Sequence, residues 1–245
     1  MNTYLISPLD CILFRGKDYI SKFVEEMENL SSGFNDFSHV GIVITSEILP
    51  CVKNLKPNIL YIWESTSSLC IPGCDTQFVP DVELGTTRFG VQIRELDKVL
   101  KAYDGSVYWA KLKVNPWLKR NILDGGKEES IIKTLETIHE KLGKAHYELN
   151  PISLFSATIT MLRPIRNCID FSIIVLHKIT NMLRLTSGSL TQLDVEEFSV
   201  FCSEFVSIIY INLGILEITC IPYDITPVNL IHEFHNLLNK PLKIN

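Results

Sequence analysis

Three residues far apart in the chain have the types needed for a nucleophile, a base and an orienting acid. Cys202 lies near the start of an apolar segment expected to be helical. Peptide dipoles and free N–H groups at such a place lower a thiol pKa and can hold an oxyanion. His39 stands at the entrance of an apolar strand, and Glu64 ends the next one. If these strands are neighbours, Glu64 can fix the tautomer of His39, and the set fits cysteine-dependent acyl transfer.

Each of these residues also has a purely structural interpretation. Cys202 alone fits a buried core cysteine on an apolar helix, and His39 fits a strand-terminal histidine bonded to a backbone carbonyl. Glu64 fits a strand-end carboxylate that faces solvent. The functional interpretation is favoured because all three types occur together in a geometry that neighbouring strands would create.

The apolar pattern predicts the elements that must position these side chains. Gly41, within the strand after His39, leaves room for another chain or a ligand to approach. The helix that carries Cys202 spans 195–214, or begins later, near Phe198 or Ser199, and belongs in the core. We further expect strands at 10–14, 40–45, 59–63, 91–96 and 106–112, a turn at 15–17, and helices at 18–30, 128–142 (ended by Gly143) and 228–238.

Length and charge restrict the class of protein. The 245 residues are 46% hydrophobic and 21% charged, which is typical of a globular protein and predicts one domain over residues 1–245. With 23 basic against 28 acidic residues and a formal charge of -5, whole-chain attraction to nucleic acid or to an anionic membrane is not expected. The composition does not exclude a local basic face, but it does not suggest one.

The seven cysteines are odd in number and scattered, and the first residues lack a secretory pattern, so we expect reduced thiols in the cytoplasm. The uncharged stretches 149–162 and 205–216 are too short to span a membrane. Cys51, Cys70 and Cys74 have no second pair at zinc-finger spacing. We therefore expect neither a metal nor a cofactor.

Short motifs in a fixed order resemble a known family. They are Leu9-Asp10-Cys11-Ile12-Leu13-Phe14, Phe37-Ser38-His39-Val40-Gly41-Ile42, Trp63-Glu64-Ser65, Gly143-Lys144-Ala145-His146-Tyr147, Phe201-Cys202-Ser203-Glu204-Phe205-Val206 and Ile225-Thr226-Pro227. The series resembles the circularly permuted papain-like superfamily, the YiiX-like relatives of NlpC-type peptidases and of lecithin retinol acyltransferase. Its members place the histidine strand before the cysteine helix, as this chain does.

The resemblance implies an α+β, permuted papain-like fold, with an antiparallel sheet packed against a core helix that carries the cysteine. It implies Cys202 as nucleophile, His39 as general base and Glu64 as the orienting residue. Tyr147, Ser38 and Ser203 are the candidate substrate-binding residues, although Glu148 follows Tyr147 where the family usually has aspartate. The implied substrate is an acyl amide or ester of a lipid, or a peptide or isopeptide bond.

The apolar segment 151–189 is longer than the family leads us to expect, and we predict a helical insertion there. Residues 151–184 could form a lid or acyl groove, make a peripheral membrane contact, or pack in the core. The rival hypothesis is a structural or interaction protein that keeps the fold, such as a virion component of a large DNA virus, in host cytoplasm or virion. The sequence leaves the oligomeric state open.

Overall fold

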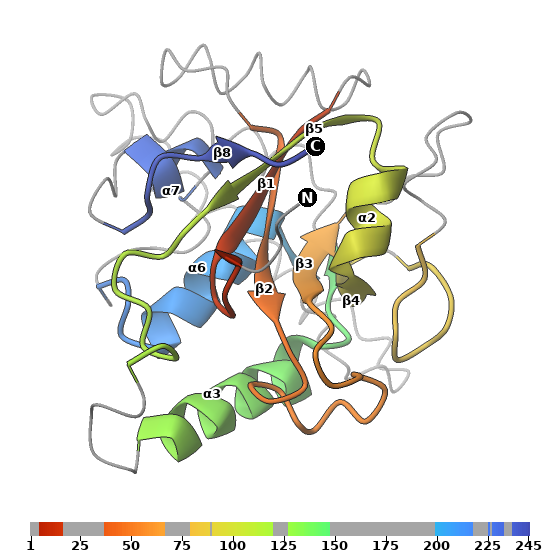
Figure 1. Ribbon diagram of the computed structural model, residues 1–245. Coiled ribbons are helices and arrows are strands. Elements are labelled where there is room, and N and C mark those ends of the chain that lie inside the picture. The colour runs from red at the N-terminus through yellow and green to blue at the C-terminus, as the bar shows by residue number, and fades with distance from the viewer. Residues whose placement is uncertain are drawn as a thin grey trace, which may run out of the picture.

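A computed structural model describes residues 5–16, 37–66, 79–88, 90–119, 127–147, 199–217, 225, 227–232 and 237–245 (Figure 1). Its main feature is a six-stranded antiparallel sheet with the order β4-β3-β2-β1-β5-β8. The strands are β1 (Cys11–Gly16), β2 (His39–Ile44), β3 (Tyr61–Thr66), β4 (Gly90–Glu95), β5 (Gly105–Ala110) and β8 (Leu242–Lys243). A parallel pair, β6 (His146–Tyr147) and β7 (Ser199–Val200), lies beside β4.

The sheet separates two apolar clusters because successive strand residues point to opposite faces. On one face, Val40 and Ile42 of β2 pack in the cluster that includes α6 (Cys202–Asn212) and α3 (Lys127–Leu142). On the other face, Val43 packs with side chains of α2 (Leu96–Ala102). Figure 1 shows α6 crossing one side of the sheet and α2 standing on the other. We call these the α6 face and the α2 face.

The predicted α+β class and the five predicted strands are confirmed, with shifted ends. The first strand continues through Gly16, so the turn expected at 15–17 is wrong at Arg15 and Gly16, which pair with β5. Glu64 does not end its strand but lies inside β3, which runs on to Thr66. Leu96 does not belong to the fourth strand, because it opens α2, whose buried residues are spaced one helical turn apart.

The helix over 128–142 is confirmed as α3, with Ile131, Leu135 and Ile138 buried along one side. The long form of the cysteine helix is wrong, because Ser199 and Val200 pair as a strand with β6 and the helix begins only at Cys202. The terminal helix is shorter than expected: α7 spans Pro227–His232, and Leu238 forms a β-bridge with Leu112 instead.

Two predictions fall outside the described residues: the helix over 18–30 and the insertion over 151–189, including the suggested membrane contact of 151–184. Among the helices of the described ranges, none is both long and apolar enough to cross a membrane.

Candidate active site

Cys202 is the first residue of α6, and its side chain is 5% exposed. The preceding Phe201 is extended and caps the helix; its N–H donates to the Glu204 carboxylate at 3.1 Å, and its carbonyl accepts from the Phe205 N–H. N–H groups of a first helical turn have no acceptor within the helix and carry the positive end of its dipole. The thiol of Cys202 therefore lies where a negative charge is stabilised.

His39 opens β2, and its side chain is 19% exposed. Its Nε2 lies 2.6 Å from Oε2 of Glu64, and its ring packs against that of Phe14 with 5.2 Å between centroids. Because Glu64 occupies Nε2, Nδ1 is the nitrogen left to meet the thiol of Cys202, with which the imidazole is hydrogen-bonded. The predicted meeting of Cys202, His39 and Glu64 is present in the structure.

The position of Glu64 follows from strand pairing. Ile42 of β2 faces Trp63 of β3, so the next pair along the register is Gly41 with Glu64. Residues two apart in a strand share a face, which puts Glu64 diagonally opposite His39 on the α2 face. The two strands are neighbours, as the sequence interpretation required.

Arg94 is a site residue that the sequence analysis missed. It lies in β4, is 6% exposed, and donates from Nε and Nη2 to Oε1 of Glu64 at 2.7 and 2.5 Å. The two oxygens of the wholly buried Glu64 are thus divided between Arg94 and His39. The sequence does contain a signal for this role, because Arg94 is a charged residue within a predicted apolar strand. A charge is rarely buried without a partner, so an acidic partner could have been expected.

The thiol and its partners approach from different faces of the sheet. His39, Glu64 and Arg94 lie on the α2 face, whereas α6 packs on the opposite face. They meet because His39 is at the very end of β2, where the backbone N–H groups of Val40 and Ser203 also help to lower the pKa of the Cys202 thiol. The site is therefore at the end of the sheet, not within one of its faces.

Charges at the site alternate in sign and reinforce one another. Burial opposes ionisation of Cys202, but the adjacent His39 cation and its hydrogen bond lower the pKa of the thiol below its usual value. Burial likewise opposes charge on His39, yet the Cys202 thiolate and Glu64 raise its pKa to about 9. Burial of Glu64 is outweighed by Arg94 and His39, which lower the pKa of that carboxyl. Each charge therefore favours the other, as in a thiolate–imidazolium pair.

Gly41 has a role other than the predicted one. A Cβ at this position would lie 2.7 Å from Cδ1 and Cγ1 of Ile62 and 3.0 Å from Cβ of Glu64. The space beside Gly41 is therefore filled by the neighbouring strand of the protein, so it does not admit a ligand. The glycine allows β3 to bring Glu64 across β2 toward His39.

The three candidate substrate-binding residues lie near the site to different extents. Ser38 donates from Oγ to the Phe14 carbonyl and accepts from the Gly16 N–H, both at 3.3 Å. Ser203 follows Cys202 in α6 and is buried. The backbone of Tyr147 pairs with Val200, two residues before Cys202.

The remaining cysteines of the described residues stand apart from this arrangement. Cys11 is buried, and burial raises the pKa of its thiol to about 12, although a 3.1 Å contact with the Tyr210 hydroxyl opposes the shift. Cys51 is exposed, and its pKa is raised by partial desolvation and by nearby acidic side chains. Within the described ranges, no group of three or more His, Cys, Asp or Glu side chains could hold a metal ion.

No family model matches the chain, and no curated protein matches it.

Proposed function

We propose that the chain is a cysteine-dependent hydrolase or acyltransferase, with Cys202 as nucleophile, His39 as general base and acid, and Glu64 as the orienting residue. The observation that carries the proposal is the 2.6 Å contact between Nε2 of His39 and Oε2 of Glu64, which leaves Nδ1 for the helix-terminal thiol. Nucleophile, base and orienter in hydrogen-bonded series are the general signature of covalent acyl transfer.

The chemistry proceeds in two steps. The Cys202 thiolate attacks the carbonyl carbon of an amide or ester, and the carbonyl π electrons move to oxygen. Collapse of this intermediate breaks the bond to the leaving group, which takes a proton from the His39 imidazolium and departs as amine or alcohol. His39 then removes a proton from water, or from another acceptor, which attacks the acyl-thioester and frees Cys202.

First-turn N–H groups of α6 are suited to stabilise the oxyanion formed in both steps, because they point toward the end of the helix where the sulfur lies. The negative charge of Glu64 stabilises the imidazolium without taking its proton. Arg94 acts as a positioning residue, since it holds one carboxylate oxygen and leaves the other for His39.

We also propose the circularly permuted papain-like fold for this chain. It is supported by the chain order of His39, Glu64 and Cys202 and by an antiparallel sheet that packs against the cysteine helix. The proposed substrates are acyl amides or esters, of lipids or of peptide and isopeptide bonds. A structural protein of the same fold would need none of the charge complementarity found around Cys202, and for that reason the enzyme is preferred.

The test is acylation of the full chain by a small activated ester, read by intact and peptide mass. We expect one acyl group, removable by hydroxylamine, on Cys202, and none in Cys202→Ala with unchanged circular dichroism. Cys51→Ala, which removes an exposed thiol, is the matched control and should keep the label. Labelling that persists at the same rate in Cys202→Ala would exclude Cys202 as the nucleophile.

A further inference from the structure

Three chain segments are hydrogen-bonded to one another along the edge of the sheet where β8 lies. The Asn115 amide donates to the Pro8 carbonyl at 2.7 Å, and the Lys113 N–H donates to the Leu237 carbonyl at 2.9 Å. The segments that these bonds join are residues 5–16, 105–119 and 237–245. We call the exposed side chains of these three segments the β8 flank.

The β8 flank is basic, although the chain as a whole is acidic. Its exposed lysines are Lys111, Lys113, Lys119, Lys240 and Lys243. The single acidic side chain in the three segments is Asp10, which is wholly buried and accepts from the indole of Trp109 and the Leu112 N–H. Within these segments no exposed acidic side chain offsets the lysines; the exposed acid that adjoins them is Asp104, which immediately precedes Gly105.

Large aliphatic side chains are also exposed in these segments. The exposed fractions are 64% for Leu5, 60% for Val114, 46% for Leu118 and 57% for Leu242. In the described part of the chain, Leu84 is the one other large apolar residue with comparable exposure. Exposed large apolar side chains beside charged ones mark a place of interaction. Here they border the edge of the sheet from both faces, because Leu242 pairs with Trp109 and the adjacent Lys243 pairs with Tyr108.

We propose that the β8 flank docks on an anionic lipid bilayer. Lysines near such a surface are attracted by its negative potential, and aliphatic side chains gain by entering the boundary with the acyl chains. Single-stranded nucleic acid is less well matched, because it requires exposed aromatic rings for stacking. The tryptophans of this region, Trp109 and Trp117, are 9% and 2% exposed.

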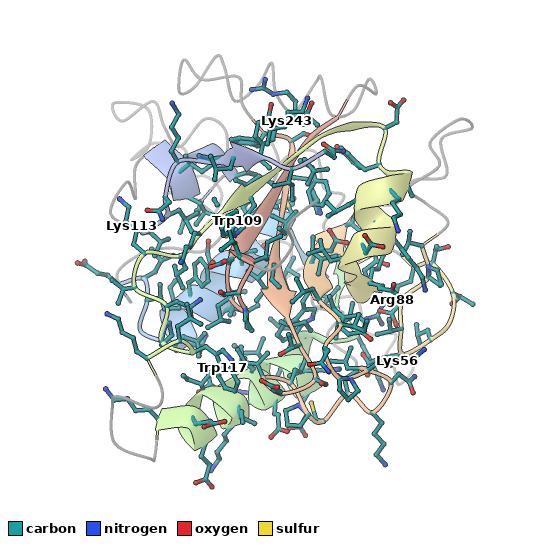
Figure 2. The ribbon with its side chains drawn as sticks, viewed as in Figure 1. Lys56, Arg88, Trp109, Lys113, Trp117 and Lys243 are labelled. Atoms are coloured by element: carbon teal, nitrogen blue, oxygen red, sulfur yellow. The ribbon has the colours of Figure 1, made fainter. Side chains whose placement is uncertain are left out.

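In Figure 2, Lys113 lies at the left edge and Lys243 near the top, over β8, whereas Lys56 and Arg88 lie toward the lower right. The flank extends to the end of the sheet that carries His39. Phe14 pairs with His39 on one side and with Val107 on the other, and the Val107 carbonyl accepts from the Ile244 N–H. Docking through the flank differs from the membrane contact expected of 151–184, and it does not depend on Cys202 chemistry.

The experiment is cosedimentation of the full chain with vesicles of phosphatidylcholine alone or with about one third phosphatidylserine. We expect binding to the anionic vesicles, weakened by added salt, and little binding to the neutral ones. The triple variant Lys113→Gln/Lys240→Gln/Lys243→Gln should bind about 100-fold more weakly, since each lysine contributes about fivefold. Leu118→Gln, which keeps all charges, should also weaken binding.

The matched control is Lys53→Gln/Lys56→Gln/Lys141→Gln, which changes net charge equally through exposed lysines outside the flank. It should bind like the unaltered chain, and so should Cys202→Ala. The proposal is overturned if the unaltered chain ignores anionic vesicles, if the control triple loses as much binding as the flank triple, or if polyuridylate binds while vesicles do not. A failed acylation test of Cys202 would leave these results unaffected, so the two proposals fail separately.

Discussion

The hydroxyl of Ser65 donates to the carbonyl oxygen of Val200 at 2.7 Å, in a fully buried bond between β3 and the residues that lead into α6. Neighbouring residues of a strand face opposite sides, so Glu64 points to His39 while Ser65 points to the segment before Cys202. One dipeptide of β3 thus touches both halves of the candidate site. This bond fixes the start of α6 relative to the strand that carries the acid.

Ser65→Ala should lower both stability and the reactivity of Cys202. The change leaves the buried Val200 carbonyl without this donor, which should reduce the free energy of unfolding by about 1 to 3 kcal/mol. Because the start of α6 loses its tether, we expect slower alkylation of Cys202. Ser207→Ala is the matched control: it removes another buried hydroxyl, bonded to the Ser203 carbonyl within α6. Equal loss of reactivity in both variants would contradict a specific role for Ser65.

The pH dependence of thiol alkylation should single out Cys202. Its pKa is lowered, so its thiolate forms at lower pH than those of Cys51 and Cys11, whose pKa values are raised. Turnover should also fall as pH rises through about 9, because His39 then loses the proton that the leaving group needs. Peptide mass spectrometry after iodoacetamide treatment at a series of pH values measures the first effect. A Cys202 that reacts only at the pH where Cys51 reacts would contradict the ion pair.

Glu64→Gln should reduce turnover without moving the site of acylation. The amide keeps the shape but loses the charge that helps to raise the pKa of His39, so the alkaline limit of activity should move below about 9. We expect a rate loss on the order of 100-fold or more, as for other orienting carboxylates. The uncompensated Arg94 cation should also cost about 3 to 5 kcal/mol of stability. An unchanged pH–rate profile would mean that another residue orients His39.

Arg94 can be tested as a positioning residue by its effect on the acidic side of the pH–rate profile. Arg94 lowers the pKa of Glu64, so Arg94→Met should raise the pKa of this carboxyl. On acidification, the variant should therefore lose activity at a higher pH than the unaltered chain does. Arg94→Lys keeps the charge but not the pair of nitrogens on Oε1, and it should restore part of the rate. The measurement is kcat/KM against pH for both variants and the unaltered chain. A uniform rate loss with no shift of the acidic limb would indicate a merely structural role.

Gly41→Ala should destabilise the sheet through contact with Ile62. The added methyl would lie 2.7 Å from two Ile62 carbons, an overlap that should cost about 1 to 3 kcal/mol. Removing those carbons with Ile62→Ala should make the double variant more stable than the sum of the two single effects predicts. Denaturant unfolding of the four proteins in this cycle measures the coupling, and strict additivity would contradict the steric explanation.

Much of the sheet was predictable because its central strands coincide with short runs of apolar residues in the sequence. Val40 to Ile44 are all buried, as expected of a strand covered on both faces. β8 was missed for the opposite reason: Leu242 and Lys243 are both exposed, and only backbone pairing with β5 makes them a strand. The start of α6 was also not readable from hydropathy, since the apolar pattern runs through Val200, which pairs with β6 instead.

The sequence by itself determined which residue types were available for chemistry and which local elements carry them: a cysteine on an apolar helix, a histidine at a strand end and a glutamate on the following strand. That the helix starts at the cysteine was decided by the pairing of β7 with β6. Only the tertiary structure decided their partners. Arg94 is buried because β4 pairs with β3, and Gly41 accommodates Ile62 because β3 also pairs with β2. The physical reason is that local patterning specifies burial and periodicity. The partner of a buried charge, or the side chain that fills the space beside a glycine, comes from a strand distant along the chain.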